Sequence, residues 1–132
     1  MYTPIISKLY DNDVLSSAEY IADVLQNPAA ANRLVDEAKK KFIEVLENPK
    51  YRPLVYDEYL ANLGYRFAIV KNHLLFYIID NDNKQVKIIR FLHGRQDWMN
   101  ILKEKTVEEM IKRALNIFCV KRKISHNGTL SP

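Results

Sequence analysis

The sequence predicts a single α+β domain, in which two N-terminal helices pack on a four-stranded, mainly antiparallel sheet (β-α-α-β-β-β) and a C-terminal helix follows. Three observations predict this fold. Two stretches with apolar residues at helical spacing come early, three short apolar strands with tight connections follow them, and a third helical stretch comes last. The 132 residues, 48% of them hydrophobic and 27% charged, suffice for one core and exclude a disordered chain.

The N-terminal segment predicts a strand, a turn and a helix. Residues 3–9 suit a short strand, with Pro4 near its start because proline lacks the donor that a ladder needs. Residues 11–13, two aspartates around an asparagine, predict a turn. Ser16 and Glu19 form a capping box, so the first helix is expected to begin at Ser16.

A second helix is expected from about Pro28 to Glu47. Asn27 is its predicted N-cap, and proline is favoured at the first helical position. Its apolar residues form one stripe. Three consecutive lysines lie mostly off that stripe beside acidic residues, which favours a solvated face over nucleic-acid binding. Asn48 followed by Pro49 ends the helix.

Three strands are expected next, after an irregular link at 50–63. Their connections are short, which predicts an antiparallel meander. The middle strand of the three is apolar on both faces and should therefore be central and covered. The expected strands are residues 65–70, 74–80 and 86–93.

The C-terminal part is expected to be an addition to the core. Residues 95–102 predict a loop or a helical turn, and 106–120 predict a helix with Cys119 as a buried, inert thiol. We therefore expect a compact domain at 1–102 and a helix with a basic tail at 103–132.

Charge and composition narrow the class of protein. The net charge is +4, with more acids than bases before residue 64 and more bases than acids after it. This asymmetry favours a polyanion or an acidic protein as partner, although lysines that only keep the chain soluble would look the same. A single cysteine excludes an internal disulfide and a multi-cysteine zinc site. No signal peptide or membrane-spanning run is visible, so a soluble cytoplasmic protein without a cofactor or metal is expected.

Arginines within apolar strands need a partner or water, because an unpaired buried guanidinium is costly. If the helices cover one sheet face, Arg66, Arg90 and Arg95 would mark an open basic face on the other. The alternative is that each arginine sits at an edge and pairs with an acid. The acids considered for such pairs are Asp57, Glu58, Asp80 and Asp97.

Histidines are the remaining candidates for proton transfer near neutral pH. His73 falls in a connection and is expected at the surface. His93 ends the last strand, with Arg95 and Asp97 close beside it in sequence. No pattern for metal ligands, a phosphate loop or a strained nucleophilic serine is present.

The stretches NPAAANRL (27–34), GYRFAIV (64–70), LLFYIID (74–80) and VKIIRFLHGRQDW (86–98) resemble the RelE/ParE family of bacterial toxins, in the family's strand and helix order. The resemblance implies the toxin of a type II toxin–antitoxin module, which causes growth arrest, stabilises plasmids and is held inactive by a cognate antitoxin. That antitoxin is expected to present an amphipathic, acidic helix to the basic face. RelE-like members cleave mRNA on the ribosome, whereas ParE-like members poison DNA gyrase.

The residues at the positions that a nuclease would use favour the ParE-like type over the RelE-like type. A RelE-like nuclease carries a third-strand arginine and a C-terminal tyrosine, and this sequence has Leu74 and no tyrosine at those positions. The ending His-Gly-Arg-Gln-Asp-Trp is also more ParE-like. If the chain is a nuclease, the implied catalytic residues are His93, Arg95, Arg66 and Arg90, with Asp97 orienting His93. The implied target-binding residues are Arg66, Arg90, His93, Arg95, Asp97 and Trp98.

Gyrase inhibition is therefore the first expectation. The second is a ribosome-dependent mRNA endonuclease. The third is a degenerate member that binds a partner without being toxic, because two of the nuclease positions are missing.

Overall fold

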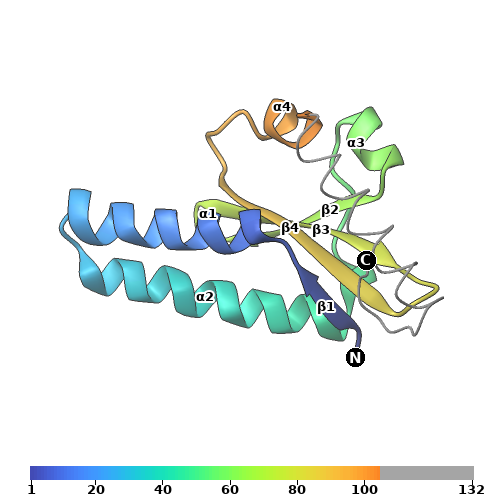
Figure 1. Cartoon of the computed structure of the whole chain (residues 1–132), viewed down its shortest axis with the longest axis horizontal. Helices are drawn as coiled ribbons and strands as arrows, with labels where there is room; N and C mark the ends of the chain where they lie inside the picture. The colour runs from blue at the N-terminus through green and yellow to red at the C-terminus, as the bar shows by residue number, and fades with distance from the viewer. Residues whose placement is uncertain (105–132) are drawn as a thin grey trace. The chain divides into compact units, whose positions relative to one another are not determined.

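The structure is a computed structural model that describes residues 1–104 (Figure 1). Its first compact unit is Met1–Trp98. The expected helix at 106–120, with Cys119, lies outside the described residues. The elements, in order, are β1 (Thr3–Ile6), α1 (Lys8–Glu19), a π-helical turn (Tyr20–Val24), α2 (Pro28–Glu47), a 3₁₀ turn (Pro49–Tyr51), α3 (Glu58–Asn62), β2 (Tyr65–Val70), β3 (His73–Asp80), β4 (Gln85–His93) and α4 (Trp98–Lys103).

The sheet confirms the expected α+β class. Its strand order is β1-β4-β3-β2, with β1 parallel to β4 and the other pairs antiparallel. β3 is central, as its two apolar faces predicted. A parallel neighbour requires a crossover, and the α1–α2 hairpin supplies it between β1 and the rest of the sheet (Figure 1). No helix among residues 1–104 is long and apolar enough to cross a bilayer.

The predicted start of the first helix is wrong. α1 begins at Lys8, and Ser7 is its N-cap, whose Oγ accepts from the backbone N of Tyr10 at 3.0 Å. The same Oγ donates to the backbone oxygen of Ile89 at 2.5 Å. The expected turn at 11–13 is therefore helical, and Ser16 lies inside the helix. The capping box at Ser16 does not start the helix, because Ser7 caps α1 earlier and also bonds to the sheet.

α2 confirms the predicted bounds. Its N-cap Asn27 accepts from Ala30 N at 3.1 Å, and Pro28 occupies the first turn. α1 and α2 run side by side (Figure 1) and bury their apolar residues against one sheet face. The core between helices and sheet contains Tyr10, Leu34, Ala38, Val45 and Leu46 from the helices, with Ala68, Val70, Leu75, Tyr77, Val86, Ile88 and Phe91 from the strands.

A β-bulge in β4 changes which of its residues face the helices. Ile88 lies opposite Tyr77, whereas Arg90 lies opposite Phe76, so one residue of β4 is extra. Beyond the bulge the alternation is inverted, and Phe91 joins Ile88 in the core under the helices. Strict alternation along a strand without a bulge would put these two residues on opposite faces of the sheet.

Candidate functional site

The segment that follows β4 is a tight turn held by its own polar groups. The backbone N of His93 donates to Oε1 of Gln96 at 2.7 Å, and the backbone N of Gln96 donates to the oxygen of His93 at 3.0 Å. The backbone N of Arg95 donates to Nδ1 of His93 at 3.0 Å. We call residues 93–98 the β4 turn. These three bonds fix its backbone and leave the Arg95 side chain exposed.

A second turn lies against the β4 turn. Residues 71–72 join β2 to β3, and the oxygen of Asn72 accepts from Gly94 N at 2.8 Å. A Cβ at Gly94 would lie 3.4 Å from that oxygen, so the approach leaves little room for a side chain. The two turns thus form one rigid end of the sheet, and Lys71 and Arg95 are both exposed there.

His73 is buried, which corrects the expectation of a surface histidine. The connection before it has only two residues, so His73 is the first residue of β3 and lies opposite His93 of β4. Its ring stacks on Phe91 at 4.9 Å and meets the His93 ring edge-on at 5.0 Å. Its side chain makes no hydrogen bond to the described residues, and its Nδ1 is fully enclosed.

The two histidines differ in what they can do chemically. Burial, and then the nearby His93, lower the pKa of His73 to about 4, so His73 is neutral at pH 7. Nδ1 of His93 accepts from Arg95, so the proton of the neutral ring sits on Nε2. The turn backbone therefore engages the lone pair of Nδ1.

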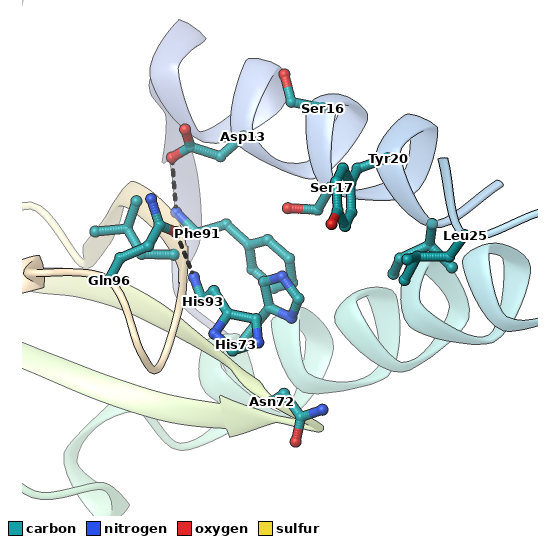
Figure 2. A pocket seen from close by; sticks show the side chains of 12 residues that line it. Asp13, Ser16, Ser17, Tyr20, Leu25, Asn72, His73, Phe91, His93 and Gln96 are labelled. Carbon is teal, nitrogen blue, oxygen red and sulfur yellow. Dashed lines mark hydrogen bonds between the residues drawn. The ribbon is translucent and has the colours of Figure 1, made fainter. Parts of the chain in front are cut away.

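Arg90 does not lie on an open face. Its Nε and Nη2 donate to Oδ2 and Oδ1 of Asp13 in α1, at 2.7 and 2.9 Å. Oδ2 of Asp13 also accepts from the backbone N of Phe91 at 3.0 Å (Figure 2). The expected pairing of an arginine with an acid is thus realised at Arg90, but Asp13 was not among the acids considered.

The guanidinium of Arg66 also has a hydrogen-bond partner within the fold. Its Nη1 donates to the backbone oxygen of Arg52 at 2.6 Å, beside the point where Leu54 pairs with β2. Arg66, Arg90 and Arg95 therefore do not form one open basic face. The physical reason is that the fold gives two of these arginines a partner close by. The bulge in β4 brings Arg90 to Asp13 of α1, and the 52–54 segment accepts a hydrogen bond from Arg66.

Trp98 packs within the fold. Its ring lies 5.3 Å from the ring of Phe76 and 5.3 Å from that of Tyr56. It is half-buried, so part of its surface stays accessible. Its contacts tie the end of the β4 turn to β3 and to the segment before α3.

A cavity of about 610 Å³ separates α1 from the ends of β3 and β4. Ser16, Ser17, Tyr20 and Leu25 lie on one side, and His73, His93 and Gln96 on the other (Figure 2). A smaller hollow of about 330 Å³ adjoins it at Asn72, His93, Gly94 and Arg95. Among residues 1–104, no three His, Cys, Asp or Glu side chains are grouped as metal ligands would be.

Several residues of this site are not distinguished by any local sequence pattern. The sequence predicts a turn at Asp13, and nothing in it singles out Ser17, Tyr20, Asn72 or Gln96. Their roles depend on tertiary bonds to β4 and on the cavity beside it, and no local pattern encodes those.

The family described as the ParE toxin of the type II toxin–antitoxin system parDE matches residues 5–98. The chain belongs to the ParE toxin family. The match ends at Trp98, so it contains the cavity and the β4 turn.

A chain in the structure of the toxin–antitoxin complex RelBE2 from Mycobacterium tuberculosis is 19% identical to this ParE-family chain, with a TM-score of 0.45. The alignment covers 70% of this chain and 96% of that one. A comparison with curated proteins finds no match.

Proposed function

We propose that this chain is a cytoplasmic, growth-arresting toxin that a cognate antitoxin neutralises, and that it inhibits DNA gyrase by binding it through the β4 turn. Membership of the ParE toxin family supports the toxin assignment. The choice of gyrase over RNA cleavage depends on the state of the side chains that cleavage would use.

The proposal of gyrase over RNA cleavage depends on one observation: side chains that a nuclease would use already have hydrogen-bond partners within the fold. Cleavage through a ribose hydroxyl needs a base, an acid and free cations for the phosphate. Arg90 forms a two-bond pair with Asp13, and Arg66 donates to a backbone oxygen. The turn backbone engages Nδ1 of His93, and His73 is buried and neutral at pH 7. The described site therefore suits binding better than proton transfer.

Among the three arginines predicted to bind the target, Arg95 is the exposed one without a side-chain partner in residues 1–104. Its guanidinium makes no hydrogen bond or ion pair to the described residues, and its backbone is fixed by His93. Because hydrogen bonds already hold the backbone of the turn, binding through Arg95 has to order only its side chain, which lowers the conformational cost of contacting a large target.

The test is induction of the full chain alone, with DNA, RNA and protein synthesis followed by pulse labelling, and a supercoiling assay with purified gyrase. Early loss of DNA synthesis and inhibited supercoiling are expected. Early loss of protein synthesis with cut mRNA would replace gyrase by the ribosome as target. Normal growth with folded protein would overturn the toxin assignment and favour a non-toxic binding module.

A further inference from the structure

The turn between β2 and β3 contains a lysine in a backbone conformation that lysine seldom adopts. Lys71 has a φ of 54°, in the left-handed region where any residue with a Cβ is crowded. Two-residue hairpin connections require such a φ, and glycine, asparagine or aspartate normally supplies it. Glycine at position 71 would fold without this strain, so the lysine needs a reason that lies in its side chain.

A second lysine shows that the strain alone does not identify a site. Lys84, in the turn between β3 and β4 at the other end of the sheet, has a φ of 53°. Its ammonium lies 5.5 Å from the centre of the Tyr2 ring, so its side chain has a contact within the fold. Lys71 is exposed, and its side chain has no hydrogen bond, ion pair or ring contact with residues 1–104. The Lys71 side chain is therefore available to a ligand.

The hollow of about 330 Å³ beside this turn is lined by hydrogen-bond donors. Its lining residues are Asn72, His93, Gly94 and Arg95. The Asn72 amide and the Arg95 guanidinium are donors, and His93 presents its Nε2–H because its Nδ1 accepts from the turn backbone. Among the described residues, neither a carboxylate nor a large apolar side chain lines the hollow. Contacts between proteins centre on large side chains in dry pockets, whereas cations and N–H groups bind phosphate oxygens, so this lining suits a phosphate.

Lys71 and the hollow are held together by the backbone. The oxygen of Asn72 accepts from the N of Gly94 at 2.8 Å, which joins the two turns. One strand of B-DNA carries a phosphate charge about every 3.4 Å along the helix axis. Two cations on joined turns, Lys71 and Arg95, can therefore meet neighbouring phosphates of one strand, and only their side chains have to be ordered on binding.

We propose that Lys71 and this hollow form a binding site for the phosphate backbone of DNA, through which the toxin contacts the DNA that gyrase holds. The inference rests on the proposed function, because gyrase supplies the DNA. It adds the chemical class of the ligand, and it adds Lys71, which no local sequence pattern singles out, as a contact. Contacts to phosphates carry no information about bases, so the binding is independent of DNA sequence.

Lys71→Gly and Lys84→Gly are a matched pair for testing the site. Each removes one lysine charge and puts glycine at a φ that glycine adopts freely, so both variants should fold, which thermal unfolding checks. Binding of the full chain to a short DNA duplex of mixed sequence is followed by fluorescence anisotropy over a series of salt concentrations. Lys71→Gly should weaken binding about 3- to 10-fold at low salt and lower the salt slope by about 1, and Lys84→Gly should change binding less than about twofold. Equal losses for the two variants would overturn the proposal.

A competitor separates phosphate from other anions. Displacing the duplex from the wild-type chain should need at least about 10-fold more poly-glutamate than unlabelled duplex, counted per charge, because the phosphates of DNA are denser and release more counterions. Equally good displacement by poly-glutamate would make an acidic protein segment the ligand and reject the phosphate site.

Supercoiling by purified gyrase separates this inference from the proposed function. Lys71→Gly should need about 3- to 10-fold more protein than the wild type for the same inhibition, and Lys84→Gly should match the wild type. Equal inhibition by Lys71→Gly and the wild type would leave gyrase as the target and overturn the DNA contact. If the wild type does not inhibit gyrase but the two variants still differ on the duplex, the proposed function fails and the phosphate site holds.

Discussion

Arg90 of β4 is clamped by Asp13 of α1 through two parallel hydrogen bonds, 2.7 Å from Nε to Oδ2 and 2.9 Å from Nη2 to Oδ1. Both side chains are largely buried, at 15% and 14% exposed. Since Oδ2 also accepts from the backbone of Phe91, Asp13 replaces the strand partner that β4 lacks beyond the end of β1. The pair therefore fastens the helical hairpin to the uncovered part of the β4 edge.

Asp13→Ala should destabilise the fold by about 2–4 kcal/mol, because it leaves a largely buried guanidinium and a backbone donor without their acceptor. Urea unfolding of Asp13→Ala, Arg90→Ala and the double variant gives the coupling between the two residues, which we expect at about 1–3 kcal/mol. Glu37→Ala is the matched control. It breaks the exposed Glu37–Lys40 pair and should cost less than about 0.5 kcal/mol. Additive single-variant effects would contradict the clamp.

Arg90→Ala and Arg95→Ala should affect toxicity in different ways. Arg95→Ala removes an exposed guanidinium and should abolish growth arrest with the melting temperature unchanged. Arg90→Ala should lower the melting temperature and reduce toxicity only as far as the folded fraction falls. The measurement is growth after induction together with thermal unfolding of each purified variant. Loss of toxicity from stable Arg90→Ala protein would instead make Arg90 a target contact.

The elements that could be predicted from the sequence are those whose signals are local. Asn27 and Pro28 mark the start of α2 because cap and first-turn preferences need nothing beyond the next few residues. The two-residue and four-residue connections likewise fix the β2–β3–β4 meander. The central place of β3 follows from its two apolar faces.

The site could be predicted only in part, because its arrangement depends on contacts between distant residues. The capping pattern at Ser16 is locally sound, but Ser7 bonds to both α1 and β4 and so starts the helix earlier. The bulge in β4 cannot be seen in a sequence that alternates well on either side of it. It moves Phe91 under the helices and brings Arg90 to Asp13.

Stability should fall as the pH drops from about 6.5 to about 4. The pKa of His73 is lowered from 6.5 to about 4 in the fold by burial and by His93, so in this window the unfolded chain binds a proton that the fold excludes. The loss from this group is on the order of 3 kcal/mol and is complete below pH 4. Unfolding of the wild type and of His73→Phe, which keeps an aromatic ring on Phe91, should show a shallower pH dependence for the variant. A His73 imidazole that titrates near 6.5 by NMR would refute this.

Tyr77→Phe should destabilise the fold by about 1–3 kcal/mol. The Tyr77 hydroxyl donates to the backbone oxygen of Pro49 at 2.6 Å in a buried position, and burial raises the pKa of Tyr77 to about 12. Removing the hydroxyl leaves that carbonyl without its donor where α2 ends beside the sheet. Tyr56→Phe, at a 76% exposed residue, is the control and should change stability little. Similar denaturation midpoints for both variants would show that the buried bond contributes nothing.

The structure and the local sequence signal place the start of α1 at different residues, and two variants can decide between them. Ser7→Ala removes the N-cap bond to Tyr10 and the bond to the oxygen of Ile89, so it should cost about 1–2 kcal/mol in urea unfolding. Ser16→Ala should cost less than about 0.5 kcal/mol, because Ser16 lies exposed within α1 and alanine is the better helix former. If Ser16→Ala were the more damaging change, the helix would begin at the capping box and Asp13 would lie in a turn. Asp13 could then not hold Arg90 as described, so this pair of variants also tests the clamp on which the choice of binding over catalysis depends.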